Sequence, residues 1–174
     1  VRKKDLGMLA VEYGHVYVAR IAMGAQPLQT VRAFHEAESY PGPSLILAYS
    51  PCIAHGIDMT TMMSHQKDAV NSGYWPIYRY DPRQAHGQEH AFHLDSRKPT
   101  VKFRDFAMQE ARFAALMRSS PAQAERLFAL AQQDIDDQWH YYEQMAGMER
   151  DIVAVSAATP TAAAPGPPSP SGDP

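Results

Sequence analysis

Residues 15–49 read HVYVARIAMGAQPLQTVRAFHEAESYPGPSLILAY, and this stretch decides the fold. Its two ends, His15–Ala22 and Ser44–Tyr49, are apolar and of strand length, and the second is continuous enough to predict a strand covered on both faces. Between them, Pro27 suits the first turn of a helix. One side of this helix carries Leu28, Val31, Phe34 and Ala37. We expect that side to be buried, and strand, helix and strand with short links predict a βαβ unit.

The rest of the chain extends this unit on both sides. A helix is expected before it, over Lys4–Tyr13, and another after it, over Asp58–Ser72. Tyr74–Tyr80 has the composition of a further strand, which we place at a sheet edge because Pro76 cannot donate to a ladder. Asp81–Pro99 shows no periodicity and is expected to be an extended loop.

Helical segments follow from Phe103 onward, and the chain is expected to fall into three parts. Residues 1–100 form an α/β portion, and residues 101–150 form helices packed on it. Residues 151–174 are rich in Ala and Pro, and we expect them to be a disordered tail.

Composition excludes several classes of partner. The 174 residues include 16 Lys and Arg and 19 Asp and Glu, with no basic stripe, so we expect no nucleic-acid partner. No apolar run approaches the roughly 20 residues of a membrane span, so we expect no membrane association. The single cysteine, Cys52, allows no internal disulfide and indicates a reducing compartment, from which we expect a cytoplasmic protein.

Cys52 comes just after the second strand, where open α/β sheets place ligands and catalytic groups. Three interpretations are open. The thiol can be a small buried side chain, since free cysteine is among the most buried residue types. It can be a nucleophile with His55 as its base, which requires a third group to orient the imidazole. It can be a metal or cluster ligand, although a four-iron cluster takes four thiolates, so its partners would lie elsewhere.

Two further groups of polar residues are weaker candidates. His86, His90 and His93 have a spacing that suits zinc ligands on a helix, but the segment contains a glycine, and we expect solvated loop histidines instead. The last helical segment carries a group of acidic residues, Asp134, Asp136 and Asp137. We expect these carboxylates to lie on a solvated helix face.

Ordered segments of the sequence carry a resemblance to a known family. They are KKDLG (3–7), YVA (17–19), MGA (23–25), EAESYPGPSL (36–45), AYSPCIAHG (48–56), AVNSGYWPIYRYDP (69–82) and FHLDS (92–96). Together they resemble the carboxyl-terminal part of the thiamine-diphosphate domain of pyruvate:ferredoxin (flavodoxin) oxidoreductases, over about residues 3–148. The resemblance implies an α/β fold with an incomplete parallel sheet of the thiamine-diphosphate-binding type, flanking helices and further helices after it.

The activity implied by this resemblance is the oxidative decarboxylation of pyruvate with coenzyme A to acetyl-CoA and carbon dioxide. Electrons would pass through 4Fe-4S clusters to ferredoxin or flavodoxin, and the complete enzyme would be a homodimer. Cys52 stands at the position of the family's cysteine in the pattern Ala-Tyr-(Ser/Ala)-x-Cys-Ile. The resemblance therefore implies that Cys52 is one of four thiolates that hold the cluster nearest the thiamine diphosphate.

The sequence also departs from the family pattern. The other three cluster cysteines, and the Gly-Asp-Gly to Asn motif that carries Mg²⁺ and diphosphate, lie upstream in the family and do not occur here. The chain begins with Val1 and no initiator Met, so we expect a truncated piece of a much longer polypeptide that is inactive alone. The alternatives are a non-catalytic interaction module derived from such a domain and, more remotely, a cysteine-dependent hydrolase.

Overall fold

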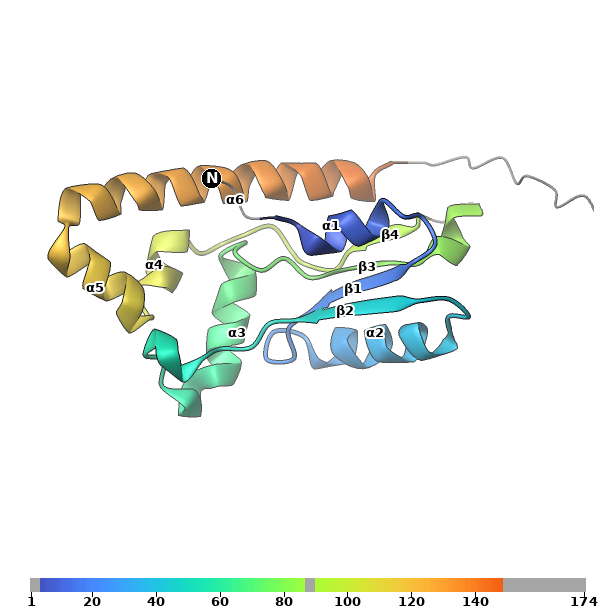
Figure 1. The fold of residues 1–174 in the computed structure, drawn as a ribbon, viewed down its shortest axis with the longest axis horizontal. Coiled ribbons are helices and arrows are strands. Elements are labelled where there is room, and N and C mark those ends of the chain that lie inside the picture. The colour runs from blue at the N-terminus through green and yellow to red at the C-terminus, as the bar shows by residue number, and fades with distance from the viewer. Residues whose placement is uncertain (1–3, 87–89, 149–174) are drawn as a thin grey trace, which may run out of the picture.

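The computed structural model describes residues 4–86 and 90–148, which form a mixed sheet with helices on both faces (Figure 1). The strands are β1 (Tyr17–Ile21), β2 (Ser44–Ala48), β3 (Tyr78–Tyr80) and β4 (Phe92–Leu94), in the order β2-β1-β3-β4. β1 and β2 are parallel, whereas β3 and β4 join the sheet in antiparallel pairs. The predicted α/β class and its βαβ unit are confirmed, and the described parallel pairing is confined to that unit.

The helices of the described residues are α1 (Leu6–Val11), α2 (Pro27–Ser39), α3 (Met62–Asn71), α4 (Phe103–Ala107), α5 (Ala111–Ser119) and α6 (Pro121–Ala146), with the short 3₁₀ turns η1 (Ile53–His55), η2 (Met59–Thr61) and η3 (Pro82–His86). None of the helices in this part of the chain combines the length and the apolar composition needed to cross a bilayer. The predicted tail, residues 151–174, lies outside the described residues.

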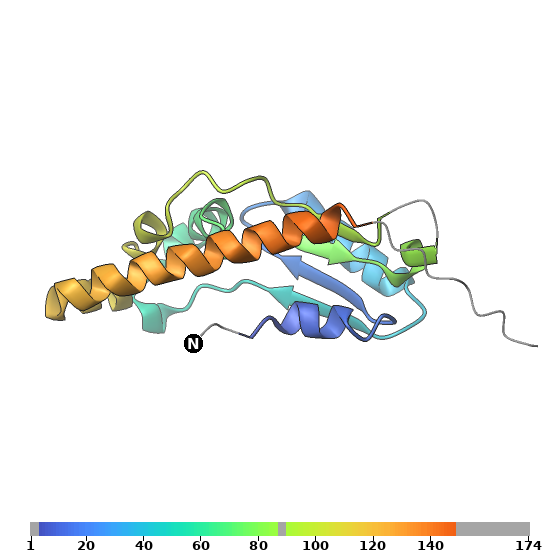
Figure 2. The same ribbon diagram turned by 90° about the horizontal axis from the view of Figure 1, so that it is seen from above.

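The side chains of β1 alternate between two cores, because successive residues of a strand point to opposite faces of the sheet. On one face, Tyr17, Ala19 and Ile21 pack with Ala33 of α2. On the other face, a cluster that includes Val18 joins the sheet to α1 and α6. Figure 2 shows α6 running across this face toward β4, with α1 on the side of β1 and β2. β1 is therefore buried along its whole length.

A separate core holds the helices beyond the end of the sheet. Phe103 and Phe106 of α4 pack with Ala69 of α3 and Phe128 of α6. Stacked and edge-on aromatic contacts dominate this core, including Phe103 against Phe128 with ring centroids 6.2 Å apart. The helices α3, α4, α5 and the first half of α6 form a lobe. The second half of α6 continues from this lobe over the sheet (Figure 1).

Several sequence-based expectations about strands are wrong. β2 was expected to be covered on both faces, but in the described part of the chain it is an edge strand and only half buried. β3 was expected at an edge, but it lies between β1 and β4 and is buried. Pro76 precedes β3, so its missing N–H does not interrupt the ladder. The loop expected over residues 81–99 contains η3 and β4, a strand too short for its periodicity to be read.

The orientation of α2 also contradicts the expectation. The helix buries Gln29, Thr30 and Ala33 against the sheet. Three apolar residues that were expected to be buried are exposed instead, namely Leu28, Val31 and Phe34. The helix forms where the apolar periodicity predicts it, but of the four residues expected to be buried only Ala37 packs against the core between helix and sheet.

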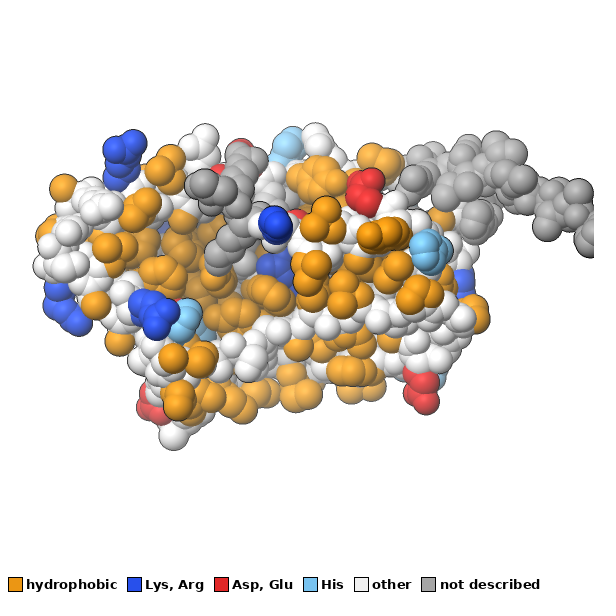
Figure 3. Space-filling view, in the orientation of Figure 1, with side chains coloured by type: hydrophobic (Ala, Val, Ile, Leu, Met, Phe, Trp, Pro, Cys, Tyr) orange, Lys and Arg blue, Asp and Glu red, His pale blue; other side chains and the backbone are white. Residues whose placement is uncertain are grey.

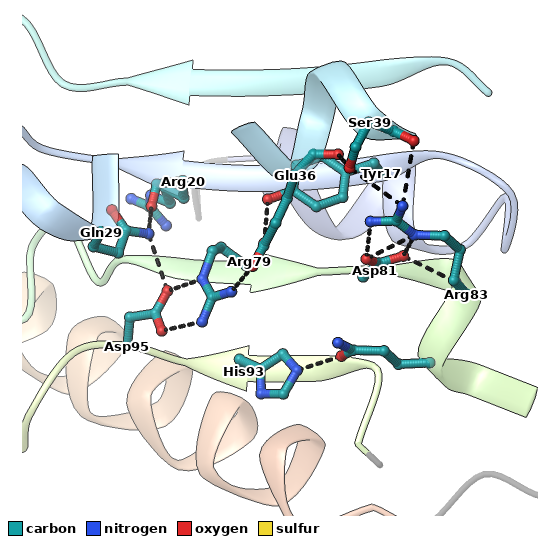
Figure 4. A network of polar contacts seen from close by, with 11 residues as sticks. Tyr17, Arg20, Gln29, Glu36, Ser39, Arg79, Asp81, Arg83, His93 and Asp95 are labelled. Atoms are coloured by element: carbon teal, nitrogen blue, oxygen red, sulfur yellow. Dashed lines mark hydrogen bonds and ion pairs between the residues drawn. The ribbon is translucent and has the colours of Figure 1, made fainter. Parts of the chain in front are cut away.

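A buried ion network explains this orientation (Figure 4). Arg79, in the middle of β3, donates to Glu36 of α2 at 2.6 Å and to both oxygens of Asp95 at 2.8 and 2.9 Å. Gln29 donates to Asp95 at 3.0 Å, and the Tyr17 hydroxyl donates to Glu36 at 2.9 Å. Burial disfavours the guanidinium charge, but the hydrogen bonds to Asp95 and Glu36 outweigh it and raise the pKa of Arg79. α2 therefore turns Gln29 and Glu36 toward the sheet, beside Ala33.

We expect Arg79→Ala to lower the free energy of unfolding by about 3–5 kcal/mol, because it leaves two largely buried carboxylates without their cation. Urea unfolding followed by circular dichroism measures the change. Arg104→Ala is the matched control, since its ion pair with Glu125 is half exposed at both ends and should contribute less than about 1 kcal/mol. Equal losses in the two variants would contradict the role assigned to Arg79.

Candidate functional site

Cys52 lies in the segment that leaves the carboxyl end of β2, and we call residues 49–56 the Cys52 loop. Pairing with β1 continues one residue beyond the strand, where Tyr49 N–H donates to the Ile21 carbonyl at 3.0 Å. Pro51 is buried, and the next side chain, the Cys52 thiol, is exposed. The interpretation of Cys52 as a buried packing residue is therefore wrong, whereas its predicted position just past a parallel strand is confirmed.

The Cys52 loop rests on the beginning of α5. Gly56 ends η1 with φ +73°, and a Cβ at this position would lie 2.4 Å from the Ala111 Cβ. Arg112 donates to the Ala54 carbonyl at 3.4 Å. Only glycine allows both the left-handed turn and this close approach. The loop that carries Cys52 is thus supported by residues more than fifty positions further along the chain.

The side chain of Glu110, the residue just before α5, holds the Cys52 loop in place. Its carboxylate contacts His55 Nδ1 at 2.8 Å and His65 Nε2 at 3.1 Å. Glu110 and His65 are almost fully buried, with 4% and 3% of their side chains exposed, whereas His55 is 40% exposed. A carboxylate only accepts hydrogen bonds, so an ionised Glu110 selects the ring tautomers that carry hydrogen on the facing nitrogens. This bridge ties η1, α3 and α5 together.

Tyr49, the first residue of the Cys52 loop, packs against two other rings. Its ring stacks on His65, with centroids 6.3 Å apart, and also contacts Trp75 at 5.4 Å. Burial, and secondarily the negative charge of Glu110, raises the pKa of Tyr49. Its hydroxyl therefore stays protonated at any physiological pH.

The loop after β1 approaches the same region. Gly24 N–H donates to the side chain of Gln66 at 2.8 Å. A Cβ on Gly24 would lie 2.2 Å from the Met63 carbonyl oxygen, so this loop touches the backbone of α3 directly. The segments that leave both parallel strands thus meet α3, one through Gly24 and the other through the Glu110 bridge to His65.

The geometry does not support the hydrolase interpretation of Cys52. Glu110 would serve as the group that orients His55. However, within residues 4–86 and 90–148 no hydrogen bond joins the Cys52 thiol to the His55 ring. A nucleophile and its base must come within hydrogen-bond reach, so the pair is not formed.

The weaker candidates whose side chains the structure describes are not gathered into a metal site. The side chain of His86 lies outside the described part, while His93 contacts Gln84, and His90 contacts the carbonyl of Met148. Asp134, Asp136 and Asp137 are exposed on α6, as expected. Among the described residues, no three His, Cys, Asp or Glu side chains are placed to hold a metal ion.

The donor set can be compared with the cluster that the resemblance implies. A 4Fe-4S cluster takes four thiolates, and this chain holds one cysteine. The exposed Cys52 fits one ligand of such a cluster, and the rest of the described chain does not supply the others.

Sequence reasoning missed Glu110 and His65, the two buried members of the bridge. Neither belongs to a motif, and they lie 45 residues apart in the chain. The one available signal was that His65 falls on the same side of its helix as the apolar Ala69, where a polar side chain needs a buried partner.

Comparison with known proteins places this chain beside a family of large enzymes. It is 54% identical over 144 residues to the putative pyruvate-flavodoxin oxidoreductase of Synechocystis sp. and 50% identical over 145 residues to the pyruvate:ferredoxin oxidoreductase of Moorella thermoacetica. It is 45% identical over 145 residues to the probable pyruvate-flavodoxin oxidoreductase of Escherichia coli. Each match takes in 83% of this chain and 12% of the relative. No protein-family model matches the chain.

We expect Glu110→Ala to destabilise the fold by about 1–3 kcal/mol, because the buried His65 ring loses its nearest hydrogen-bond partner. Hydrogen exchange of the Cys52 loop amides should also accelerate, since the loop loses its support. Glu125→Ala is the control, because that carboxylate is half exposed. Unchanged exchange in residues 52–56 of the Glu110 variant would show that the bridge does not hold the loop.

Proposed function

Because this chain belongs to the family of the pyruvate:ferredoxin and pyruvate-flavodoxin oxidoreductases, we propose that it works as one segment of such an enzyme. The reaction proposed for the complete enzyme oxidises pyruvate with coenzyme A to acetyl-CoA and carbon dioxide and transfers two electrons to ferredoxin or flavodoxin. The observation that carries the proposal is the 45–54% identity over 83% of the chain. The chain spans 12% of these relatives, so we assign the reaction to the longer enzyme and not to these residues alone.

Within that enzyme, Cys52 is the proposed ligand of a 4Fe-4S cluster. Its thiol is exposed, stands just past a parallel strand and is carried by a loop that Glu110 anchors. A ligand needs this combination of an accessible sulfur and a supported backbone. When bound, the cluster carries electrons one at a time toward the acceptor.

The proposal assigns the other cluster ligands and the thiamine diphosphate site to regions of the enzyme outside this chain. Three further thiolates, and the groups that hold thiamine diphosphate and Mg²⁺, would come from elsewhere in a homodimeric enzyme. We place its work in the cytoplasm, where an exposed thiol stays reduced.

We expect the isolated chain to bind no stoichiometric 4Fe-4S cluster, because one thiolate cannot hold four irons. Anaerobic reconstitution with iron and sulfide, followed by iron analysis and electron paramagnetic resonance of the reduced sample, tests this. One cluster per chain would contradict the proposal that Cys52 shares its cluster with ligands from outside this chain.

The role of Cys52 is tested in a chimera in which this chain replaces the matching 144 residues of the Synechocystis relative. We expect Cys52→Ser to remove one cluster signal from the electron paramagnetic resonance spectrum and to slow acceptor reduction severalfold, with little change in pyruvate binding. Ser50→Ala, in the same exposed loop, is the matched control. An unchanged cluster content and unchanged acceptor reduction in the Cys52 variant would refute the ligand role.

A further inference from the structure

Glu110 is a buried carboxylate beside the Cys52 loop, and the groups that contact it leave its charge in place. Within residues 4–86 and 90–148 the carboxylate pairs with the rings of His55 and His65 and with no lysine or arginine. Each contact needs a single ring N–H, which a neutral histidine supplies. With an ionised Glu110 and two neutral rings, this group of three side chains carries one net negative charge.

This charge acts on the Cys52 loop itself. After burial, the negative charge of Glu110 is the second cause that raises the pKa of Tyr49, the first residue of the loop. Arg112 on α5 carries the opposite charge, but it is exposed and donates to the Ala54 carbonyl at 3.4 Å. Water and salt screen an exposed charge more strongly than a buried one. We therefore expect the buried carboxylate to outweigh the exposed guanidinium.

A short path of contacts joins Glu110 to Cys52. The backbone N–H of His55 donates to the Cys52 carbonyl at 3.0 Å, and the His55 ring contacts the Glu110 carboxylate at 2.8 Å. On its other side the carboxylate contacts His65, whose ring lies 4.8 Å from the Phe106 ring between centroids. The carboxylate is therefore held at a fixed place one residue away from the backbone of the cysteine.

The surface around the loop is apolar. Figure 3 shows hydrophobic side chains gathered over η1 and η2. Ile53, which follows Cys52, is 73% exposed, and Met59 in η2 is 38% exposed. Apolar side chains take the place of water that would otherwise screen a neighbouring charge. A carboxylate at this place acts on its surroundings more strongly than one on a solvated surface.

We propose that Glu110 is a positioning residue that lowers the reduction potential of the 4Fe-4S cluster bound through Cys52, by fixing a negative charge beside the Cys52 loop. This inference rests on the proposed function, because it concerns the cluster assigned to Cys52. Each electron released by pyruvate oxidation reduces the oxidised cluster, and transfer of that electron to ferredoxin or flavodoxin restores it. A neighbouring negative charge repels the added electron, so reduction becomes less favourable and the reduced cluster becomes a stronger donor.

Glu110→Gln in the Synechocystis chimera tests the charge, because glutamine keeps the shape and an acceptor oxygen but is neutral. Potentiometric titration followed by electron paramagnetic resonance measures the ratio of reduced to oxidised cluster, read from the signal that Cys52→Ser removes. At a fixed ambient potential we expect this ratio to rise severalfold in the Glu110 variant. An unchanged ratio would overturn the proposal.

Asp58→Asn is the matched control for the loss of one negative charge. Asp58 caps η2, the turn that follows the Cys52 loop, and it is exposed. Asparagine keeps the capping oxygen, so this turn should persist. We expect the ratio of reduced to oxidised cluster to change much less than in the Glu110 variant. Equal changes in the two variants would overturn the specific role of the buried carboxylate.

Hydrogen exchange of the isolated chain separates the charge of Glu110 from its support of the loop. Glu110→Gln should leave the exchange of residues 52–56 close to that of the unsubstituted chain, whereas Glu110→Ala accelerates it. If Glu110→Gln accelerated exchange as much as Glu110→Ala does, a shifted potential would be assigned to the displaced loop, and the proposal would be overturned.

The Cys52→Ser chimera separates this proposal from the proposed function. If every cluster signal persists in that variant, the ligand role of Cys52 fails, and the role of Glu110 fails with it. If Cys52→Ser removes a signal whose potential Glu110→Gln leaves unchanged, the ligand role stands and only the role of the Glu110 charge is refuted.

Discussion

The burial of Arg79 in the middle of the sheet is the constraint on which the other features of the fold depend. Its guanidinium is held between Glu36 of α2 and Asp95 after β4, so one side chain fastens a helix and two strands. A buried cation requires partners on the elements that cover it. α2 meets this requirement by turning Gln29 and Glu36 toward the sheet, and three of its larger apolar side chains, Leu28, Val31 and Phe34, consequently face solvent.

A second arginine, Arg20, links the sheet to α6 on the face opposite α2. Arg20 of β1 lies over the Trp75 ring at 3.9 Å and donates to the Tyr142 hydroxyl of α6 at 3.2 Å. Tyr142 in turn donates to Asp5, the residue that caps α1. The central strands are thus tied to helices on both faces by charged groups, whereas no strand of the described residues pairs with the outer edge of β2.

The Cys52 loop, too, is held in place by residues that are distant from it in the sequence. Its exposed thiol stands on a short turn, and the turn is held by Glu110 and by the close contact between Gly56 and Ala111. The thiol is therefore accessible to a partner while its backbone is fixed. Such an arrangement suits a residue that contributes to a site shared with other parts of a larger protein, as proposed for the cluster.

The sequence by itself determined the βαβ unit, the place of Cys52 after its second strand and the family of the chain, because periodicity and ordered motifs are local properties. Only the tertiary structure decided that β2 is an edge, that β3 is internal and that α2 turns its apolar side outward. The orientation of α2 depends on Arg79 and Asp95, whose side-chain partners lie between 16 and 66 residues away in the chain. Apolar periodicity shows that a helix has two different sides, but a buried charge on a neighbouring strand decides which side faces the sheet.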